Sequence, residues 1–230
     1  GSWSSGSTGI ATINSSTGVI SGVGAGTATM TYTKTGTGGC SNATATRTVT
    51  VTAAPSAGTL SGTQAICVGG SSTFSSTVGG GSWSSGSTGI ATINSSTGAI
   101  SGVSAGTATM TYTATGTGGC SNATATRTVT VTAAPVGGSI SSAATECFGE
   151  NSATLTLSGE TGSITKWQYS TDNWSTPVDI TNTTNTQAYS NLTATTKYRA
   201  VIQSGVCAAT NSTDITITVY DVIVPGIIEW

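Results

Sequence analysis

The sequence contains an almost identical copy of part of itself. Residues 1–55 and 81–135 align without a gap. They differ at three pairs of positions, namely Val19/Ala99, Gly24/Ser104 and Lys34/Ala114. The period is therefore 80 residues, which is longer than a solenoid repeat and matches a small domain that folds on its own. The sequence predicts a chain of consecutive small domains.

The repeat also predicts where these domains begin and end. Residues 1–54 form a partial domain whose N-terminal strands are missing, and residues 55–134 form a complete one. Residues 135–220 form a divergent domain, and the tail 221–230 has no assignment. Gly1 corresponds to Gly81, which has 26 residues of the same domain before it. We therefore expect the sequence to be a window of a longer repetitive protein.

Apolar and polar residues alternate in the segments between turns. "TATMTYTAT" (107–115) places apolar side chains on one face and threonines on the other, and "DITITVY" (214–220) does the same. This period of two is typical of half-buried antiparallel strands. "IATINSSTGAISGV" (90–103) predicts a hairpin, and no segment has a helical period. The predicted fold is all-β, with tandem immunoglobulin-like β-sandwich domains of about seven strands in 80 residues.

The composition excludes several classes of function. Only 6% of the residues are charged, against about a quarter in typical soluble domains, and a nucleic-acid partner would require a basic surface. The chain has no His, the commonest general base and metal ligand. Pro225 interrupts the longest apolar stretch, 222–228, so no membrane span is expected. We expect no enzyme activity, no catalytic residues, no cofactor and no metal site.

Two motifs carry a resemblance to known families. "WSSGSTGIATINSSTGAISGVSAGTATMTYT", followed by "ATATRTVTV", resembles the bacterial immunoglobulin-like group 2 domain, with Ala91, Ile93, Gly98 and Val129 at matching positions. Residues 135–220 are more loosely similar to fibronectin-III-like repeats. There, "NLTATTKYRAVIQSG" resembles a tyrosine-corner segment, which implies that Tyr198 begins an inner strand.

Together, these repeats resemble those of giant Bacteroidota cell-surface adhesins, which the type IX secretion system exports and which act in attachment or gliding. The resemblance implies an extracellular or bacterial cell-surface location. It also implies that the secretion machinery is a partner acting outside this window.

Five cysteines fit the repeat in a definite way. They are Cys40, Cys67, Cys120, Cys147 and Cys207. We predict the disulfides Cys67–Cys120 and Cys147–Cys207, one in each complete domain, and expect the partner of Cys40 to precede residue 1. Small domains with cores of Ala, Val and Ile need such a bond, and it persists only in an oxidising compartment. The alternative is that these cysteines are buried free thiols.

Aromatic residues are the remaining candidates for a site. Trp83 and Trp167 are predicted to pack in the cores of their domains, against the disulfides, and Trp3 is the copy of Trp83. Trp174 lies in the polar loop "STDNWSTP" near Tyr169. We predict Trp174 and Tyr169 as possible ligand contacts.

The leading functional prediction is a structural and adhesive repeat segment that forms a semi-rigid stalk or filament. Its expected partners are neighbouring repeats of the same chain and surface glycans or other cells. Two alternatives stay open: a carbohydrate-binding accessory module of a secreted enzyme, and a strand-exchanged extracellular polymer.

Overall fold

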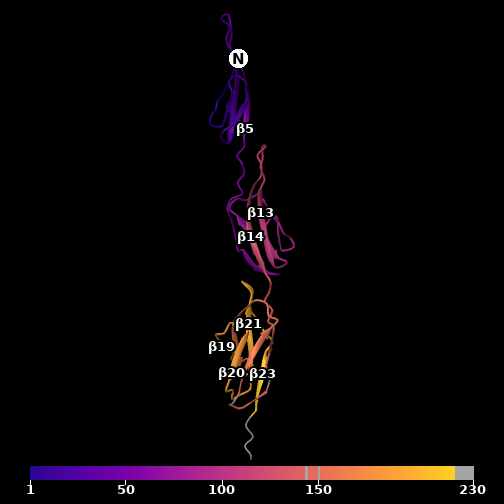
Figure 1. The fold of residues 1–230 in the computed structure, drawn as a ribbon. Helices are drawn as coiled ribbons and strands as arrows, with labels where there is room; N and C mark the ends of the chain where they lie inside the picture. Colours follow the sequence, from indigo (N-terminus) through magenta and orange to yellow (C-terminus); the bar gives the residue numbers. More distant parts are fainter. Residues whose placement is uncertain (143–144, 150, 221–230) are drawn as a thin grey trace, which may run out of the picture.

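The computed structural model describes residues 1–142, 145–149 and 151–220, so the unassigned tail 221–230 lies outside the described residues. All regular structure in this part of the chain consists of β-strands, which confirms the all-β prediction. The strands form three groups that follow one another along a long axis (Figure 1). No helix in the described segments is long and apolar enough to cross a membrane.

The second domain has nine strands. They are β6 (Leu60–Ser61), β7 (Ala65–Cys67), β8 (Ser71–Thr73), β9 (Ser75–Ser76), β10 (Ser82–Ser85), β11 (Ala91–Ile93), β12 (Ala99–Gly102), β13 (Gly106–Ala114) and β14 (Ala123–Thr132). One sheet has the order β10-β13-β14-β7, a second has the order β11-β12-β8, and β6 pairs with β9. Strand β7 runs parallel to the last strand, β14.

The first domain repeats part of this arrangement with five strands. They are β1 (Ser2–Ser5), β2 (Ala11–Ile13), β3 (Ile20–Gly22), β4 (Gly26–Lys34) and β5 (Ala43–Val51). The sheets β1-β4-β5 and β2-β3 correspond to β10-β13-β14 and β11-β12. Within residues 1–54 there is no counterpart of strands β6 to β9.

The third domain again has nine strands. They are β15 (Ser139–Ser141), β16 (Thr145–Cys147), β17 (Ser152–Ser158), β18 (Ser163–Ser170), β19 (Val178–Ile180), β20 (Thr186–Ser190), β21 (Thr196–Gln203), β22 (Thr210–Asn211) and β23 (Ile215–Tyr220). Its sheets are β15-β17-β20 and β16-β23-β21-β18-β19, with β22 beside β21. Strand β16 runs parallel to the last strand, β23, as β7 does to β14.

Alternating side chains explain why these segments form strands with one buried face. On β13, Ala108, Met110 and Tyr112 are buried, while the threonines between them are more exposed. Threonine suits the wet face, because its branched Cβ favours extended backbone and its hydroxyl stays hydrated. The predicted hairpin is confirmed as β11–β12, whose turn ends at Gly98 with a φ of 73°.

Each complete domain has a core centred on its tryptophan. Trp83 is 6% exposed and packs against Phe74 and Tyr112, with ring centroids 6.3 and 4.8 Å away. Trp167 is fully buried, and its indole N–H donates to the carbonyl of Thr184. The predicted core role of both residues is therefore confirmed. In the second domain, however, the indole packs on aromatic rings and not on a disulfide.

Candidate functional site

The described chain contains one disulfide, and it connects two domains. It joins Cys67 of the second domain to Cys207 of the third, with 5.4 Å between their Cα atoms and 140 residues between them in the sequence. Cys40, Cys120 and Cys147 are free thiols. The predicted pairs Cys67–Cys120 and Cys147–Cys207 were therefore wrong.

The strand register gives the physical reason for this correction. Cys67 lies opposite Thr132, the last residue of β14, whereas Cys120 precedes Ala123, the first residue of β14. Nine residue steps along a strand span about 30 Å, while a disulfide requires Cα atoms within about 7 Å. The two cysteines of one sandwich thus lie at opposite ends, and each faces a neighbouring domain.

Backbone hydrogen bonds hold Cys67 where the chain leaves the second domain. The N–H of Val68 donates to the carbonyl of Thr132 at 2.9 Å, and the N–H of Gly69 donates to the carbonyl of Gly102 at 3.0 Å. Gly69 has a φ of 78°, which favours glycine. Parallel pairing with β14 therefore carries Cys67 to the boundary with the third domain.

A tight turn holds Cys207 where the chain enters the third domain. The N–H of Cys207 donates to the carbonyl of Ser204 at 2.9 Å, and Gly205 has a φ of 48°. The sulfur of Cys207 lies 3.7 Å from the carbonyl oxygen of Thr132 and 3.6 Å from that of Ala133. Cys207 is 3% exposed, so its side chain is enclosed at this boundary.

The predicted contact residue Trp174 covers the outer face of the third domain's larger sheet. Its ring stacks on the guanidinium of Arg199, 4.0 Å from the ring centroid, and its indole N–H donates to Asp214 at 3.2 Å. Trp174 has a φ of 70°, a conformation that is a clear outlier for a bulky side chain. The local hydrogen bonds of the loop hold it there, since its backbone N–H donates to the Ser170 hydroxyl at 2.8 Å.

Carboxylates around Trp174 are stabilised in their charged form. Hydrogen bonds from the side chains of Thr176 and Ser170 lower the pKa of Asp172 from 3.8 to about 2. The indole N–H of Trp174, and then the nearby Lys197 ammonium, lower the pKa of Asp214. Low pKa values make these groups poor proton donors near neutral pH. The Trp174 cluster therefore reads as a polar brace of the loop.

Tyr169 lies on the other face of the same strand. It packs against the core of the third domain, and its ring centroid is 6.1 Å from that of Tyr198. Burial, with added effects of Tyr169 and Tyr189, raises the pKa of Tyr198 to about 12. The structure therefore does not bring Trp174 and Tyr169 to one surface.

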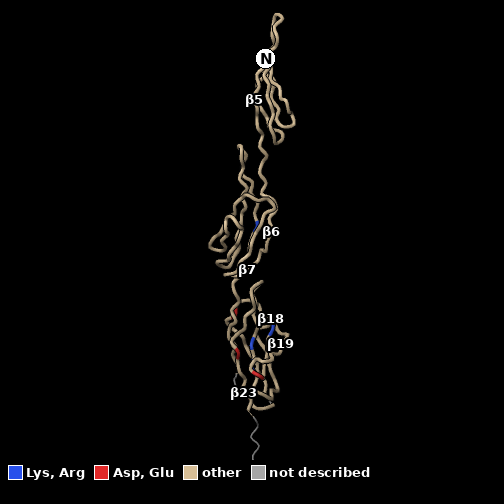
Figure 2. Tube along the Cα trace, turned by 180° about the vertical axis from the view of Figure 1, so that it is seen from behind, with Lys and Arg blue, Asp and Glu red and all other residues tan. Residues whose placement is uncertain are grey.

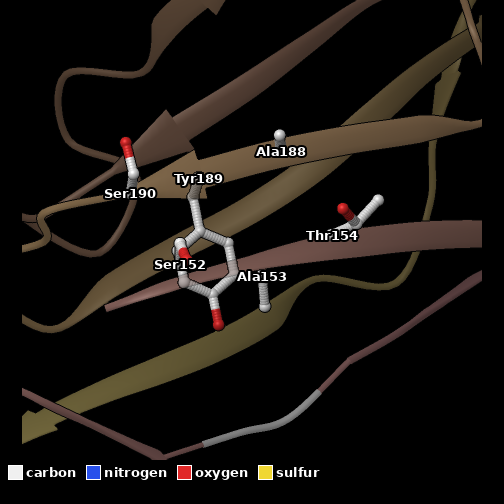
Figure 3. Close-up of a pocket in the computed structure, with 6 residues that line it drawn as sticks. All are labelled: Ser152, Ala153, Thr154, Ala188, Tyr189 and Ser190. Atoms are coloured by element: carbon white, nitrogen blue, oxygen red, sulfur yellow. The ribbon is translucent and has the colours of Figure 1, made fainter. Parts of the chain in front are cut away.

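A depression of about 380 Å³ lies over strands β17 and β20 (Figure 3). Its lining residues are Ser152, Ala153, Thr154, Ala188, Tyr189 and Ser190. The Tyr189 hydroxyl donates to Glu146 at 2.7 Å, and burial is the first cause that raises the pKa of this tyrosine. The lining offers hydroxyl and methyl groups and no carboxylate, amine or thiol, so it holds no acid–base pair.

Charged side chains are sparse, and Figure 2 shows the acidic ones in the domain that contains β18, β19 and β23. Residues 1–134 contain no Asp or Glu. Within the described residues, no three His, Cys, Asp or Glu side chains gather as a metal ion would require.

These features define a chain of tandem immunoglobulin-like β-sandwich domains with a covalent joint. A family model described as "Domain of unknown function (DUF8696)" matches residues 136–221. No curated protein sequence matches the chain.

Solved structures of multidomain chains are similar to this one. Three consecutive titin domains share 13% identity, with a TM-score of 0.38 over 92% of this chain and 83% of that one. Extracellular domains 3–5 of Drosophila OTK share 10% identity, with a TM-score of 0.43 over 95% and 84%. The FN1–FN3 domains of chicken CNTN1 share 11% identity, with a TM-score of 0.34 over 86% and 77%.

Proposed function

We propose that this chain is a structural and adhesive segment of a large extracellular surface protein, where it forms a semi-rigid stalk or filament for attachment or gliding. The observation that carries this proposal is the bond between Cys67 and Cys207, which ties two consecutive domains at their shared boundary. The in-line order of the three domains supports it (Figure 1).

Two connections restrict bending at that boundary. One is the short linker Ala133–Pro135, in which the proline ring fixes φ and restricts the residue before it. The other is the disulfide, which prevents the third domain from swinging away from Cys67. With ten residues in β14, each domain adds about 33 Å of length. Such units suit a spacer, because length accumulates with repeat number.

The extracellular part of the proposal rests on redox chemistry and composition. A structural disulfide persists in oxidising compartments and is rare in the cytosol. A surface rich in hydroxyls, with 6% charged residues, depends little on the salt of the medium. The sequence resemblance to Bacteroidota adhesins adds export by the type IX system and contact with surface glycans or other cells to the proposal.

Immunogold labelling of intact cells tests this function. Antibodies against residues 55–134 are expected to label filaments or stalks at the surface of unpermeabilised cells of the source organism. Brief protease treatment of intact cells is expected to remove the label. Labelling that requires permeabilisation, with an intracellular control protein equally inaccessible beforehand, would contradict the proposal.

The burial of the tryptophans weakens the carbohydrate-binding alternative. Trp83 and Trp167 are buried, and one face of Trp174 is occupied by Arg199, so no row of exposed aromatic rings is available among the described residues. Polysaccharide binding by the wild-type chain that Trp174→Ala abolishes would revive this alternative.

An apolar groove in the first domain favours the strand-exchange alternative. The groove has a volume of about 230 Å³ and is lined by residues that include Trp3, Ile20, Met30 and Val49. A polymer that forms through this groove would give larger species at higher concentration, which sedimentation velocity measures. Monomers at all concentrations would exclude it.

A further inference from the structure

The turn that carries Cys120 in the second domain has the same geometry as the turn that carries Cys207 in the third. In both turns, the cysteine N–H donates to the carbonyl three residues earlier, at 3.1 Å for Thr117 and 2.9 Å for Ser204. The next residue in each turn is a glycine with positive φ, 60° for Gly118 and 48° for Gly205. The two domains therefore present their cysteines on matching turns.

Both turns also contact the preceding domain at equivalent residues. The sulfur of Cys207 lies 3.7 and 3.6 Å from the carbonyl oxygens of Thr132 and Ala133. The sulfur of Cys120 lies 3.6 and 3.9 Å from those of Thr52 and Ala53, which are one period of 80 residues earlier. Cys120 thus occupies, at the first boundary, the place that Cys207 occupies at the second.

What distinguishes the two boundaries is the segment that delivers the second cysteine. In the second domain, β7 delivers Cys67, and a few residues later the same segment inserts Phe74 into the core. Phe74 packs between Trp83 and the guanidinium of Arg127. In the first domain, the equivalent Trp3 and Arg47 line the open groove. The residues that complete the core and those that complete the joint thus belong to one segment, 55–80.

We propose that Cys120 is one half of a second inter-domain disulfide, whose other half is a cysteine on a segment of the 55–80 type seated on the first domain. In the register of β7, that cysteine lies opposite Thr52, as Cys67 lies opposite Thr132. The sulfur of Cys120 is already 3.6 Å from the Thr52 carbonyl oxygen. This inference rests on the observed joint and is independent of an adhesive role.

Cys147 is the outgoing half of the same kind of joint in the third domain. Strand β16 pairs with β23 in parallel and places Cys147 opposite Tyr220. The N–H of Phe148 donates to the carbonyl of Tyr220 at 2.9 Å, as Val68 donates to Thr132 at 2.9 Å. Gly149 follows with a φ of 76°, close to the 78° of Gly69. Each complete domain therefore has one incoming and one outgoing cysteine.

Formation of each bond requires an oxidant. Two thiols lose two protons and two electrons as the S–S bond forms, and a low-molecular-weight disulfide such as oxidised glutathione accepts them and becomes two thiols. The inference therefore applies to protein that has been oxidised in this way.

The deciding experiment adds one repeat to the full chain. A variant with residues 55–134 present twice in succession has seven cysteines, five plus the two of the added copy. The proposal predicts two bonds, Cys67 of the first copy to Cys120 of the second and Cys67 of the second copy to Cys207. After refolding with oxidised glutathione, denaturation and reaction with a thiol reagent, three thiols are expected.

Every other count contradicts the proposal. Five thiols would mean that the new boundary forms no bond, and one thiol would mean that each complete domain closes its own disulfide. Cys120→Ser in the second copy is the matched control and is expected to raise the count to four. Circular dichroism checks that both variants keep their strands.

A second experiment uses the chain as it is. A peptide of residues 55–80 is incubated with the full chain and oxidised glutathione, and the cross-linked cysteine is identified by mass spectrometry. The proposal predicts bonding to Cys120 in preference to Cys40 and Cys147, although both of these are more exposed. A peptide with Phe74→Asp is expected to lose this preference. Cross-linking that follows exposure, or an unreactive peptide, would overturn the proposal.

Discussion

The first and second repeats have almost the same sequence but do not bury it equally. Ile100 is 1% exposed, whereas the equivalent Ile20 is 42% exposed. Trp83 is buried, while Trp3 is only partly buried. The comparison shows that the side chains of the shared 55 residues do not enclose a core by themselves.

The missing component is the segment that precedes the shared part. In the second domain, Arg127 donates to the carbonyls of Leu60 at 3.2 Å and Gly62 at 2.8 Å, and its guanidinium lies 5.4 Å from the Phe74 ring. The equivalent Arg47 is exposed. The same residue type thus has a structural role in one repeat and a solvated one in the other.

Phe74→Ala should most strongly weaken the contrast between the repeats. Phe74 is fully buried, and truncation of a buried Phe costs about 3–5 kcal/mol because it removes contacts and leaves a cavity. Hydrogen exchange read by mass spectrometry should show faster exchange in the second domain, with Trp83 approaching the exposure of Trp3. Unchanged protection of β13 and β14 would contradict this account.

A matched pair of substitutions measures the contrast at one position. Ile100→Ala is expected to cost the second domain about 2–5 kcal/mol, because Ile100 is buried. Ile20→Ala is expected to cost the first domain about 0.5 kcal/mol, as is usual for exposed side chains. Peptides from the two repeats differ in mass at Val19/Ala99, so hydrogen exchange can follow each domain. Equal losses would mean that the first domain is as enclosed as the second.

The two domain boundaries differ in the same way, because only the second has a bond. Cys67→Ser is expected to lower the stability of the bonded pair of domains by about 2–4 kcal/mol. Thiol titration after denaturation should give three thiols for the oxidised wild type, from Cys40, Cys120 and Cys147. The intra-domain pairing would leave one thiol. Cys40→Ser serves as the control and should leave the stability unchanged.

Acid should separate the third domain from the two repeats by the smallest effect. Residues 1–134 have no carboxylate side chain, whereas the pKa of Asp172 is lowered from 3.8 to about 2 in the folded state. A lowered folded pKa gives stability that is present above about pH 4 and is lost as the pH falls towards 2. Only the third domain should therefore lose melting temperature over this range.

Thr176→Val removes the first-listed cause of that shift and keeps the side-chain shape. The pKa of Asp172, measured by NMR titration, is expected to rise towards 3.8. The acid sensitivity of the third domain should decrease with it. An unchanged pKa would mean that Ser170 and the backbone determine the charge state of Asp172.

The all-β fold could be predicted from the sequence, because alternation is a local signal. "TATMTYTAT" became β13 and "DITITVY" became β23, and both differ from the predicted bounds by only one residue at an end. The burial of Trp83 and Trp167 also followed from their places in strands. The boundaries of the predicted domains stay a prediction.

The disulfide could not be predicted from cysteine counts, because pairing depends on which end of the sandwich each cysteine occupies. A local signal was nevertheless present in the sequence. Cysteines at the entry of a domain end a Thr/Ser-Gly-x-Cys turn (37–40, 117–120, 204–207), and those at the exit precede a residue and a glycine (67–69, 147–149). The Trp174–Arg199 contact is between strand and loop residues 25 positions apart, and no periodicity reports it.

The bond between Cys67 and Cys207 encloses most of two domains within one covalent ring. A protease that cuts the backbone once, anywhere between residues 68 and 206, leaves both fragments attached through sulfur. A nicked molecule would therefore keep its full mass on a non-reducing gel and separate only after a reductant is added. In a fibre exposed to hydrolytic enzymes, one cleaved peptide bond in this stretch would not sever the strand.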